Sequence, residues 1–163
     1  MVPTVKKMTD AERKIINKAF RLLKIRPHTR QELIRKLTAR GYSYREAAAT
    51  VAECERLGFV NDELFAEDYL RELAGRGQGE RMIRMKMWRK GLPEQLIEEK
   101  LSEFRDSSSA AERAAKVLEG KITLLKRESD RFKRRAKAYR FLASRGFDAD
   151  AIRSALEGWD ENN

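Results

Sequence analysis

The sequence predicts an all-α protein made of three tandem three-helix repeats, each helix-turn-helix-like, stacked into an elongated, curved array. Two observations lead to this prediction. A pattern of apolar and cationic residues around a glycine is written three times within the 163 residues. Around the glycines, apolar residues recur three and four positions apart, which is the spacing of one face of an α-helix.

The repeat becomes visible when three glycines are aligned, Gly41, Gly91 and Gly146. The first two lie 50 residues apart and the last two lie 55 residues apart. A large apolar residue stands four positions before each glycine, a cation stands immediately before it, and apolar residues follow six, ten and thirteen positions after it. Glycine supplies the left-handed backbone that a short turn between two helices requires. The aligned apolar slots hold Leu37, Met87 and Leu142; Ala47, Ile97 and Ile152; Val51, Leu101 and Leu156; and Cys54, Phe104 and Trp159.

These spacings divide the chain into an N-terminal extension at 1–14 and three-helix repeats at 15–58, 59–106 and 107–163. A unit of this size buries little apolar surface, so neighbouring units must stack to be stable. The second interval between glycines is longer than the first, and we place the extra residues around 119–133.

Helix starts are marked by residues whose side chains accept backbone N–H groups. Thr29 with Glu32, and Ser43 with Glu46, have the spacing of a capping box. Pro93 fits the first turn of a helix. Further caps are expected at Asn61, at Asp148 and within Ser107, Ser108 and Ser109.

Residues suited to catalysis are sparse. His28 is the only histidine and is expected to be a solvated loop residue, and the single Cys54 is interpreted as a small core residue. The glycine-rich loop 75–79 lacks the Lys-Ser/Thr pair of a phosphate-binding loop, so a plain connector is favoured over a phosphate contact through its amides. We expect no enzyme, no cofactor and no metal.

The chain has no apolar run of about 18 residues, so no membrane span is expected. Its N-terminus lacks the apolar stretch of a secretory signal, and one cysteine cannot form an internal disulfide. A reduced, cytoplasmic protein is therefore predicted.

The charge pattern is more informative. Thirty-six Lys and Arg against 26 Asp and Glu give a net charge of +10, which attracts polyanions. The cations concentrate on the second helix of each repeat: residues 121–145 hold ten cations and two acids, and residues 79–91 hold five and one. A solvated surface without a partner is the alternative. The candidate contacts to a filament or nucleic acid are Arg84, Lys86, Arg89, Lys90, Arg131, Lys133, Arg134 and Arg135.

Four segments together resemble the bacterial recombination regulator family RecX, over nearly the whole chain. Each is modest alone, but the four in order are specific. Met87 and Trp88 depart from the leucine-rich pattern before the second glycine, which we expect to affect packing more than role. The four segments are 19–37 (AFRLLKIRPHTRQELIRKL), 58–69 (GFVNDELFAEDY), 79–92 (GERMIRMKMWRKGL) and 141–147 (FLASRGF).

The resemblance implies tandem three-helix repeats that bind the RecA recombinase filament on single-stranded DNA and restrain its ATPase and strand exchange, in recombination and the DNA-damage (SOS) response. It implies a non-enzymatic partner of RecA, of single-stranded DNA in the filament and of free DNA, and we expect a monomer. It does not transfer a defined binding site, so the candidate contacts rest on charge alone.

Two other classes remain open. A helix-turn-helix transcriptional regulator places its second helix in the major groove, but such readers usually dimerise, and the third helix of the first repeat (AAATVAECER) is poor in base-reading side chains. A purely structural scaffold is favoured only if no polyanion binding is found.

The repeat array makes one prediction about size. A globule of this length would have a radius of gyration of roughly 15 Å. Small-angle scattering is expected to give a clearly larger value, and a value equal to that of the globule would contradict the array.

Overall fold

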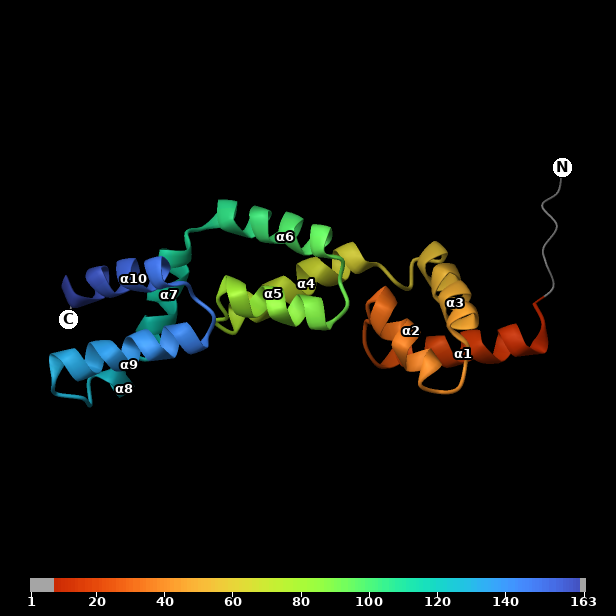
Figure 1. The fold of residues 1–163 in the computed structure, drawn as a ribbon, viewed down its shortest axis with the longest axis horizontal. Helices are drawn as coiled ribbons and strands as arrows, with labels where there is room; N and C mark the ends of the chain where they lie inside the picture. The colour runs from red at the N-terminus through yellow and green to blue at the C-terminus, as the bar shows by residue number, and fades with distance from the viewer. Residues whose placement is uncertain (1–7, 162–163) are drawn as a thin grey trace. The chain divides into compact units, whose positions relative to one another are not determined.

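The computed structural model describes residues 8–161, and this part of the chain is helical throughout, without strands (Figure 1). The all-α prediction is confirmed. The helices group in threes, with the short α8 inserted after α7, in the segment where extra residues were expected. The helices are α1 (Asp10–Ile25), α2 (Arg30–Thr38), α3 (Tyr44–Arg56), α4 (Asp62–Gly75), α5 (Glu80–Arg89), α6 (Glu94–Ser107), α7 (Ala110–Glu119), α8 (Ile122–Leu125), α9 (Arg131–Ser144) and α10 (Ala149–Glu161).

The chain forms two compact units. Unit 1 contains residues 8–65 together with Lys90–Leu92, and unit 2 contains Ala66–Arg89 together with residues 93–161. The units do not coincide with the three repeats, because the turn that follows α5 packs on unit 1 while the body of α5 belongs to unit 2.

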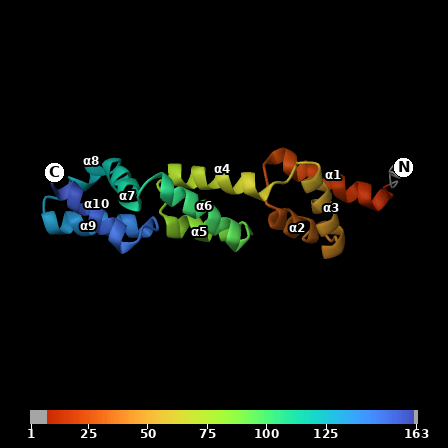
Figure 2. The same cartoon turned by 90° about the horizontal axis from the view of Figure 1, so that it is seen from above.

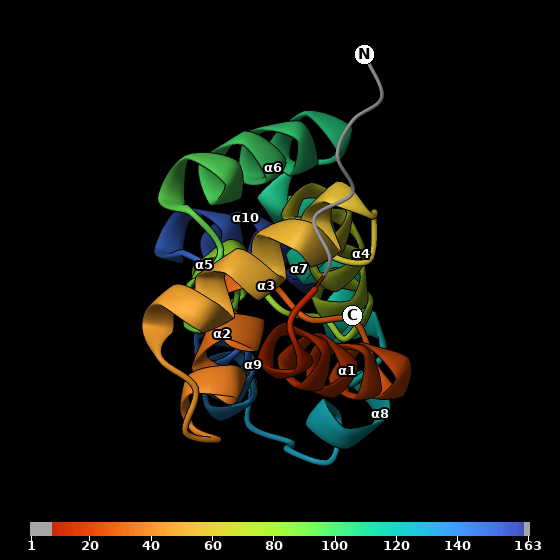
Figure 3. The ribbon, with the colours of Figure 1, turned by 90° about the vertical axis from the view of Figure 1, so that its right-hand side faces the viewer.

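In unit 1, helices α1, α2 and α3 enclose one apolar core (Figure 3). Leu37, Ala47, Val51 and Cys54, the four slots predicted for the first repeat, are all fully buried. Helix α1 begins at Asp10, within the segment predicted as an extension, because Thr9 and Glu12 form a capping box there.

The start of α2 differs from the sequence prediction. Thr29 Oγ1 accepts the N–H of Glu32 at 3.0 Å, as expected. The Glu32 carboxylate does not return to Thr29, however, and instead accepts from Arg26 at 2.5 and 3.0 Å. The capping box predicted at Thr29 is therefore only half right: the hydrogen bond to the Thr29 side chain forms, but the predicted bond from the Thr29 backbone to Glu32 is wrong. Arg26 binds the Glu32 carboxylate through both guanidinium nitrogens instead.

The other helix starts follow the sequence more closely. The capping box of Ser43 and Glu46 is confirmed, as are the caps at Asn61 and Asp148. Ser109 caps α7. Pro93 lies one residue earlier than expected, immediately before the first residue of α6.

Unit 2 contains the remaining slots. In the region of α7, α9 and α10 (Figure 2), Leu142, Ile152, Leu156 and Trp159 pack in a second apolar core. The slots of the middle repeat are also buried at Met87, Ile97 and Leu101, whereas Phe104 is only half-buried.

Trp88 does not behave as expected. It was predicted to alter packing, but its side chain is 69% exposed and its neighbour Met87 fills the core slot alone. Trp88 is therefore a surface residue on α5.

The aligned glycines have the predicted backbone conformation, with φ values of +91°, +80° and +91° at Gly41, Gly91 and Gly146. In unit 2, the turn at Gly146 packs directly on the start of α5. The Gly79 N–H donates to the carbonyl of Arg145 at 2.8 Å, and the Arg81 N–H donates to that of Gly146 at 3.2 Å. The loop 75–79 is thus part of a packing joint, by which we mean a turn that packs on the start of another helix. Its last amide, that of Gly79, donates to a carbonyl of the protein.

Unit 1 contains an equivalent joint. Here Thr29 Oγ1 donates to the carbonyl of Lys90 at 2.5 Å, and a Cβ on Gly91 would lie 2.7 Å from the Cβ of Gln31. Both joints include a hydrogen bond to the backbone carbonyl of the cationic residue immediately before the turn glycine, which is Lys90 in one joint and Arg145 in the other. The repeated glycine therefore serves two purposes: it ends one helix, and it lets that turn approach the start of another.

The joint in unit 2 can be tested with Gly79→Ala. The added Cβ would lie 2.4 Å from the backbone of Gly146 and Phe147, and backbone cannot give way as a flexible side chain would. We expect the free energy of unfolding to fall by about 2 kcal/mol and Tm to fall by about 4–8 °C, measured by circular dichroism. Gly75→Ala is the matched control, because nothing lies within 4 Å of its added Cβ. Equal melting of the two variants would contradict the joint.

Candidate nucleic-acid interface

The clearest cationic surface lies at the start of α9. Arg131 and Lys133 are exposed there and Arg134 is half-buried. The first turn of α9 contains no acidic residue, although Asp130 caps it by accepting the N–H groups of Phe132 and Lys133 at 2.9 and 3.0 Å. A helix start carries partial positive charge, so each cation there costs about 0.3–1 kcal/mol. A bound anion would remove that cost.

The predicted contacts on α9 are not all equivalent. Arg131, Lys133 and Arg134 make no ion pair with the side chains that the structure describes, those of residues 8–159. Arg135 instead donates to the carbonyl of Leu156 on α10 at 3.4 Å. Lys137 is paired with Glu128 at 2.6 Å, and this hydrogen bond lowers the pKa of the Glu128 carboxyl. The side chains available to a partner are therefore those of the first turn.

The predicted contacts around α5 do not form one patch. Arg84 contacts the carboxylates of Glu80 and Glu98, and Arg105 contacts the same two residues. Two guanidinium groups and two carboxylates thus form a balanced ion cluster that holds α5 to α6. The charge of Arg84 is neutralised within the protein.

The remaining contacts predicted in the second repeat are separated. Lys86 is half-buried and Arg89 is exposed on α5. Lys90 belongs to unit 1, where its Nζ lies 3.7 Å from a carboxylate oxygen of Glu32. Arg89, next to the exposed Trp88, is the clearest surface cation of this group.

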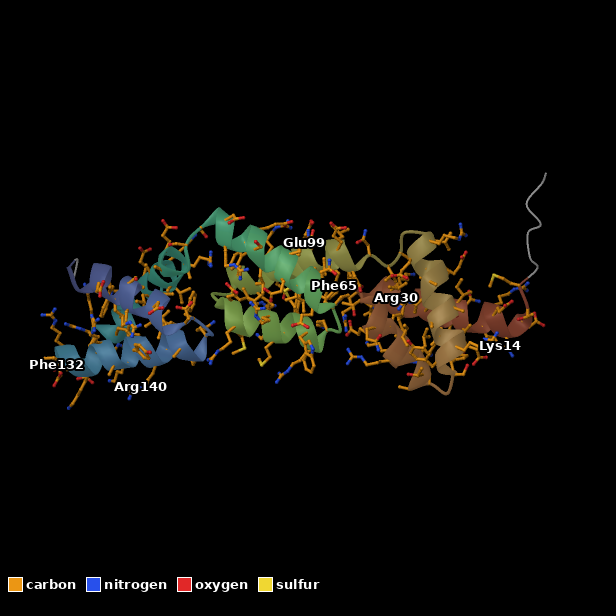
Figure 4. The ribbon with its side chains drawn as sticks, turned by 45° about the horizontal axis from the view of Figure 1, so that its top comes forward. Lys14, Arg30, Phe65, Glu99, Phe132 and Arg140 are labelled. Atoms are coloured by element: carbon orange, nitrogen blue, oxygen red, sulfur yellow. The ribbon has the colours of Figure 1, made fainter. Side chains whose placement is uncertain are left out.

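The sequence analysis did not identify two exposed aromatic residues beside these cations. Phe132 is 84% exposed between Arg131 and Lys133, and Trp88 is 69% exposed beside Arg89. Figure 4 shows Phe132 at the start of α9 and Arg140, another exposed cation, farther along it. Bases of single-stranded nucleic acid stack on such rings while cations contact the phosphates. The sequence did contain a sign that these two rings are exposed, because neither Phe132 nor Trp88 occupies one of the apolar slots of the repeat.

The cations of α5 and the start of α9 lie apart within unit 2. Arg81 Nη2 donates to the carbonyl of Ala143 at 3.2 Å, which places the start of α5 at the end of α9. The cations at 131–134 lie at the opposite end of that 14-residue helix, about 20 Å away. The arrangement is a series of contacts suited to an extended polyanion rather than a single pocket.

The two candidate reactive residues are both in the interior. His28 was expected to be solvated, but this is wrong: it is buried, its Nδ1 lies 2.8 Å from the carbonyl of Arg26, and burial lowers its pKa. Cys54 is a core residue as predicted, and burial raises the pKa of its thiol to about 11. A thiol with this pKa is protonated at neutral pH, which removes most of its nucleophilicity.

Among the side chains that the structure describes, residues 8–159, no group of three or more His, Cys, Asp or Glu residues is arranged to hold a metal ion. Of the helices that the structure describes, none is both long enough and apolar enough to cross a membrane.

Comparison with known proteins covers almost the entire chain. The first, second and third three-helix domains of RecX match residues 16–54, 61–101 and 109–156. The regulatory protein RecX of Chlorobium phaeobacteroides (strain BS1) is 35% identical over 152 residues, which cover 92% of this chain and 97% of the relative. The chain belongs to the RecX family.

Other members of the family agree. The regulatory protein RecX of Legionella pneumophila (strain Corby) is 34% identical over 85% of this chain and 90% of its own length. The crystal structure of RecX from Lactobacillus salivarius has the same fold, with a TM-score of 0.81 and 21% identity over 94% of this chain and 99% of that one. The Chlorobium and Legionella relatives are named as regulatory proteins, and the RecX name fits a role in recombination and DNA repair.

Reversing a positive charge at the start of α9 should raise the stability of the protein, although it should weaken contact with a polyanion. Arg131→Glu should raise the free energy of unfolding by about 1 kcal/mol, because it replaces a cation with an anion at the positive end of the helix. Thermal melting should show a gain in Tm of about 2–4 °C. Arg140→Glu, away from the helix start, is the control and should not raise Tm. A lower Tm for Arg131→Glu than for wild type would show that the dipole argument does not apply here.

Proposed function

We propose that this chain binds the RecA filament on single-stranded DNA and negatively modulates the ATPase and strand-exchange activities of RecA. It would act in the cytoplasm as a monomer, without a cofactor and without catalysis of its own, in recombination and the response to DNA damage. Membership of the RecX family supports this regulatory role. The charge distribution supports contact with a polyanionic filament.

The observation that carries the proposal is the composition of the first turn of α9. Arg131, Lys133 and Arg134 make no ion pair within the described chain, and Phe132 is exposed between them. Cations contribute salt-dependent affinity for phosphates without reading sequence. An exposed ring adds stacking on any base. This combination suits a protein that binds a filament on DNA of any sequence.

The start of α9 is also accessible in a way that the starts of α2 and α5 are not. The start of α2 contacts the turn at Lys90–Leu92, and the start of α5 contacts the turn at Gly146. Within the described residues no turn packs on the start of α9. Among the three second helices, α9 therefore presents its cationic first turn to a partner.

The geometry does not favour the alternative of a major-groove reader. Helix α3 would be the recognition helix of the first repeat, but its exposed residues include Ala49 and Ala52. Its exposed Arg56 is paired with Glu53 at 2.6 Å. Direct readout depends on Arg, Asn or Gln side chains that reach base edges, and α3 offers few of them.

The proposal is tested by reversing the charges at Arg131, Lys133 and Arg134 to Glu and measuring inhibition of the DNA-dependent ATPase of RecA. Inhibition by this variant should require at least a tenfold higher concentration. Wild-type inhibition should weaken as salt rises, because counterion release supplies much of the affinity for polyanions. Circular dichroism should show an unchanged helical content.

The matched control reverses Lys14, Arg21 and Lys24, three exposed cations of α1, and so changes the net charge by the same amount. It should inhibit nearly as well as wild type. If the two triple variants lose the same amount of inhibition, net charge rather than α9 determines binding. If the α9 variant inhibits like wild type at every salt concentration, the proposed contact is wrong.

A further inference from the structure

Unit 2 contains an open groove of about 880 Å³ that the cationic second helices do not explain. It is lined by residues of α4 from Glu67 onward and of the following loop, by α6, by α7 and the residues that follow it, and by the end of α9. Its volume lies at the upper end of the range of about 300–1,000 Å³ for ligand sites. It has room for several side chains of a bound molecule.

The groove is strongly cationic. Seven Lys and Arg side chains line it, against the two carboxylates of Glu67 and Glu103. Both carboxylates contact the buried Lys100, at 2.9 and 3.5 Å. The groove therefore has no acid left to balance its other cations.

Apart from Lys100, the cations that line the groove fall into two groups. Arg71 and Arg76 are paired with acids of their own helix, at 2.9 and 2.7 Å. The other four are contributed by α7, α9 and the residues that follow them, and they make no ion pair in the part of the chain that the structure describes. These four are Arg113, Lys116, Lys121 and Arg145.

Arg113 shows most clearly that the groove lacks an anion. Its Nη1 donates to the carbonyl and hydroxyl oxygens of Ser108 and to the carbonyl of Phe104, so the side chain is fixed in place. Burial lowers the pKa of this guanidinium, because the carboxylates of Glu80 and Glu112 offset only part of the lost hydration. A half-buried cation whose hydrogen bonds go to neutral oxygens is stabilised when an anion arrives.

The floor between the cations is apolar. Leu70, Phe104, Val117 and Phe141 are half-buried and face the groove. Apolar side chains that remain partly open to water beside unbalanced cations are complementary to a ligand that carries both apolar groups and negative charge.

We propose that this groove docks an acidic, amphipathic segment of a partner protein. Its apolar side chains would cover Leu70, Val117 and the edges of the two rings, while its carboxylates would contact Arg113, Lys116 and the other two cations. A helix that presents an apolar face to a groove and charge to the rim is a common mode of peptide recognition. This protein-docking site goes beyond the filament function proposed above and is independent of the surface at the start of α9.

A nucleic acid fits the same groove less well. Base stacking requires open ring faces, but the guanidinium of Arg113 lies 4.0 Å from the ring centre of Phe104. The ring of Phe141 has Arg145 at 5.2 Å and Lys121 at 5.7 Å. The cations thus occupy the rings that bases would use, whereas Trp88 and Phe132 remain exposed elsewhere.

The test uses the whole chain and a fluorescent synthetic peptide that forms an amphipathic helix with leucine on one face and glutamate on the other. Fluorescence anisotropy should show saturable binding. The same peptide with lysine in place of glutamate should not bind. Lys116→Glu with Lys121→Glu should weaken binding of the acidic peptide at least tenfold, and Val117→Thr should weaken it several-fold, because a hydroxyl then faces the apolar side chains of the ligand.

Two controls separate this site from the nucleic-acid surface. Lys126→Glu with Arg127→Glu reverses two exposed cations outside the groove and should leave peptide binding unchanged. The variant reversed at Arg131, Lys133 and Arg134 should also retain the peptide while losing affinity for oligo(dT). Loss of the peptide but not of oligo(dT) by the Lys116 and Lys121 variant would support the groove as a protein site.

Several outcomes would overturn the proposal. One is that the acidic peptide does not bind the wild-type protein, and another is that the Lys116 and Lys121 variant binds it as tightly as wild type does. Displacement of the peptide by oligo(dT), with equal loss of both ligands in that variant, would instead identify a nucleic-acid groove. None of these measurements uses RecA, so failure here is distinguishable from failure of the filament proposal.

Discussion

The close approach of Gly79 to Gly146 is the contact on which the packing of unit 2 depends. The carbonyls of Arg145 and Gly146, directly after α9, accept from the amides of Gly79 and Arg81 at the start of α5, so groups left over at one helix end satisfy those at another. The negative end of one helix dipole also faces the positive end of the other. Neither residue can carry a side chain, because a Cβ on Gly146 would lie 2.6 Å from the backbone nitrogen of Met82.

The same constraint explains why the second helices are not interchangeable. The start of α2 receives the Lys90–Leu92 turn through the Thr29 hydroxyl, and its first amide, that of Arg30, donates to Asp62 at 2.7 Å. The start of α5 receives the Gly146 turn through the amides of Gly79 and Arg81, so these amides are not available to a phosphate. Some cations on these helices are used inside the protein: Arg30 is 3.1 Å from Glu55, and Arg84 contacts two carboxylates. Similar charge in the sequence therefore includes structural ion pairs in α2 and α5, whereas the first turn of α9 is accessible.

Unit 2 thus contains two cationic surfaces of different chemistry. At the start of α9 the aromatic ring of Phe132 is exposed, and within the described residues its neighbouring cations contact no aromatic ring, which suits a nucleic acid. In the groove beside α7 the rings of Phe104 and Phe141 are covered by cations, and apolar side chains form the floor. The two proposals thus place contact with nucleic acid and docking of a protein on different surfaces of one unit.

The sequence by itself determined the helices, the repeat and most of the buried slots. These depend on residues within about four positions of one another: the spacing of Ile97 and Leu101, the cap that Ser43 forms with Glu46, and the left-handed turn at Gly146. It also located cationic second helices. Only the tertiary structure decided which cations are available, because the partners of Arg105 and Lys100 lie 25 and 33 residues away in sequence. For the same reason burial of His28, exposure of Trp88 and the groove beside α7 could not be predicted, since each depends on where distant helices pack rather than on the local pattern.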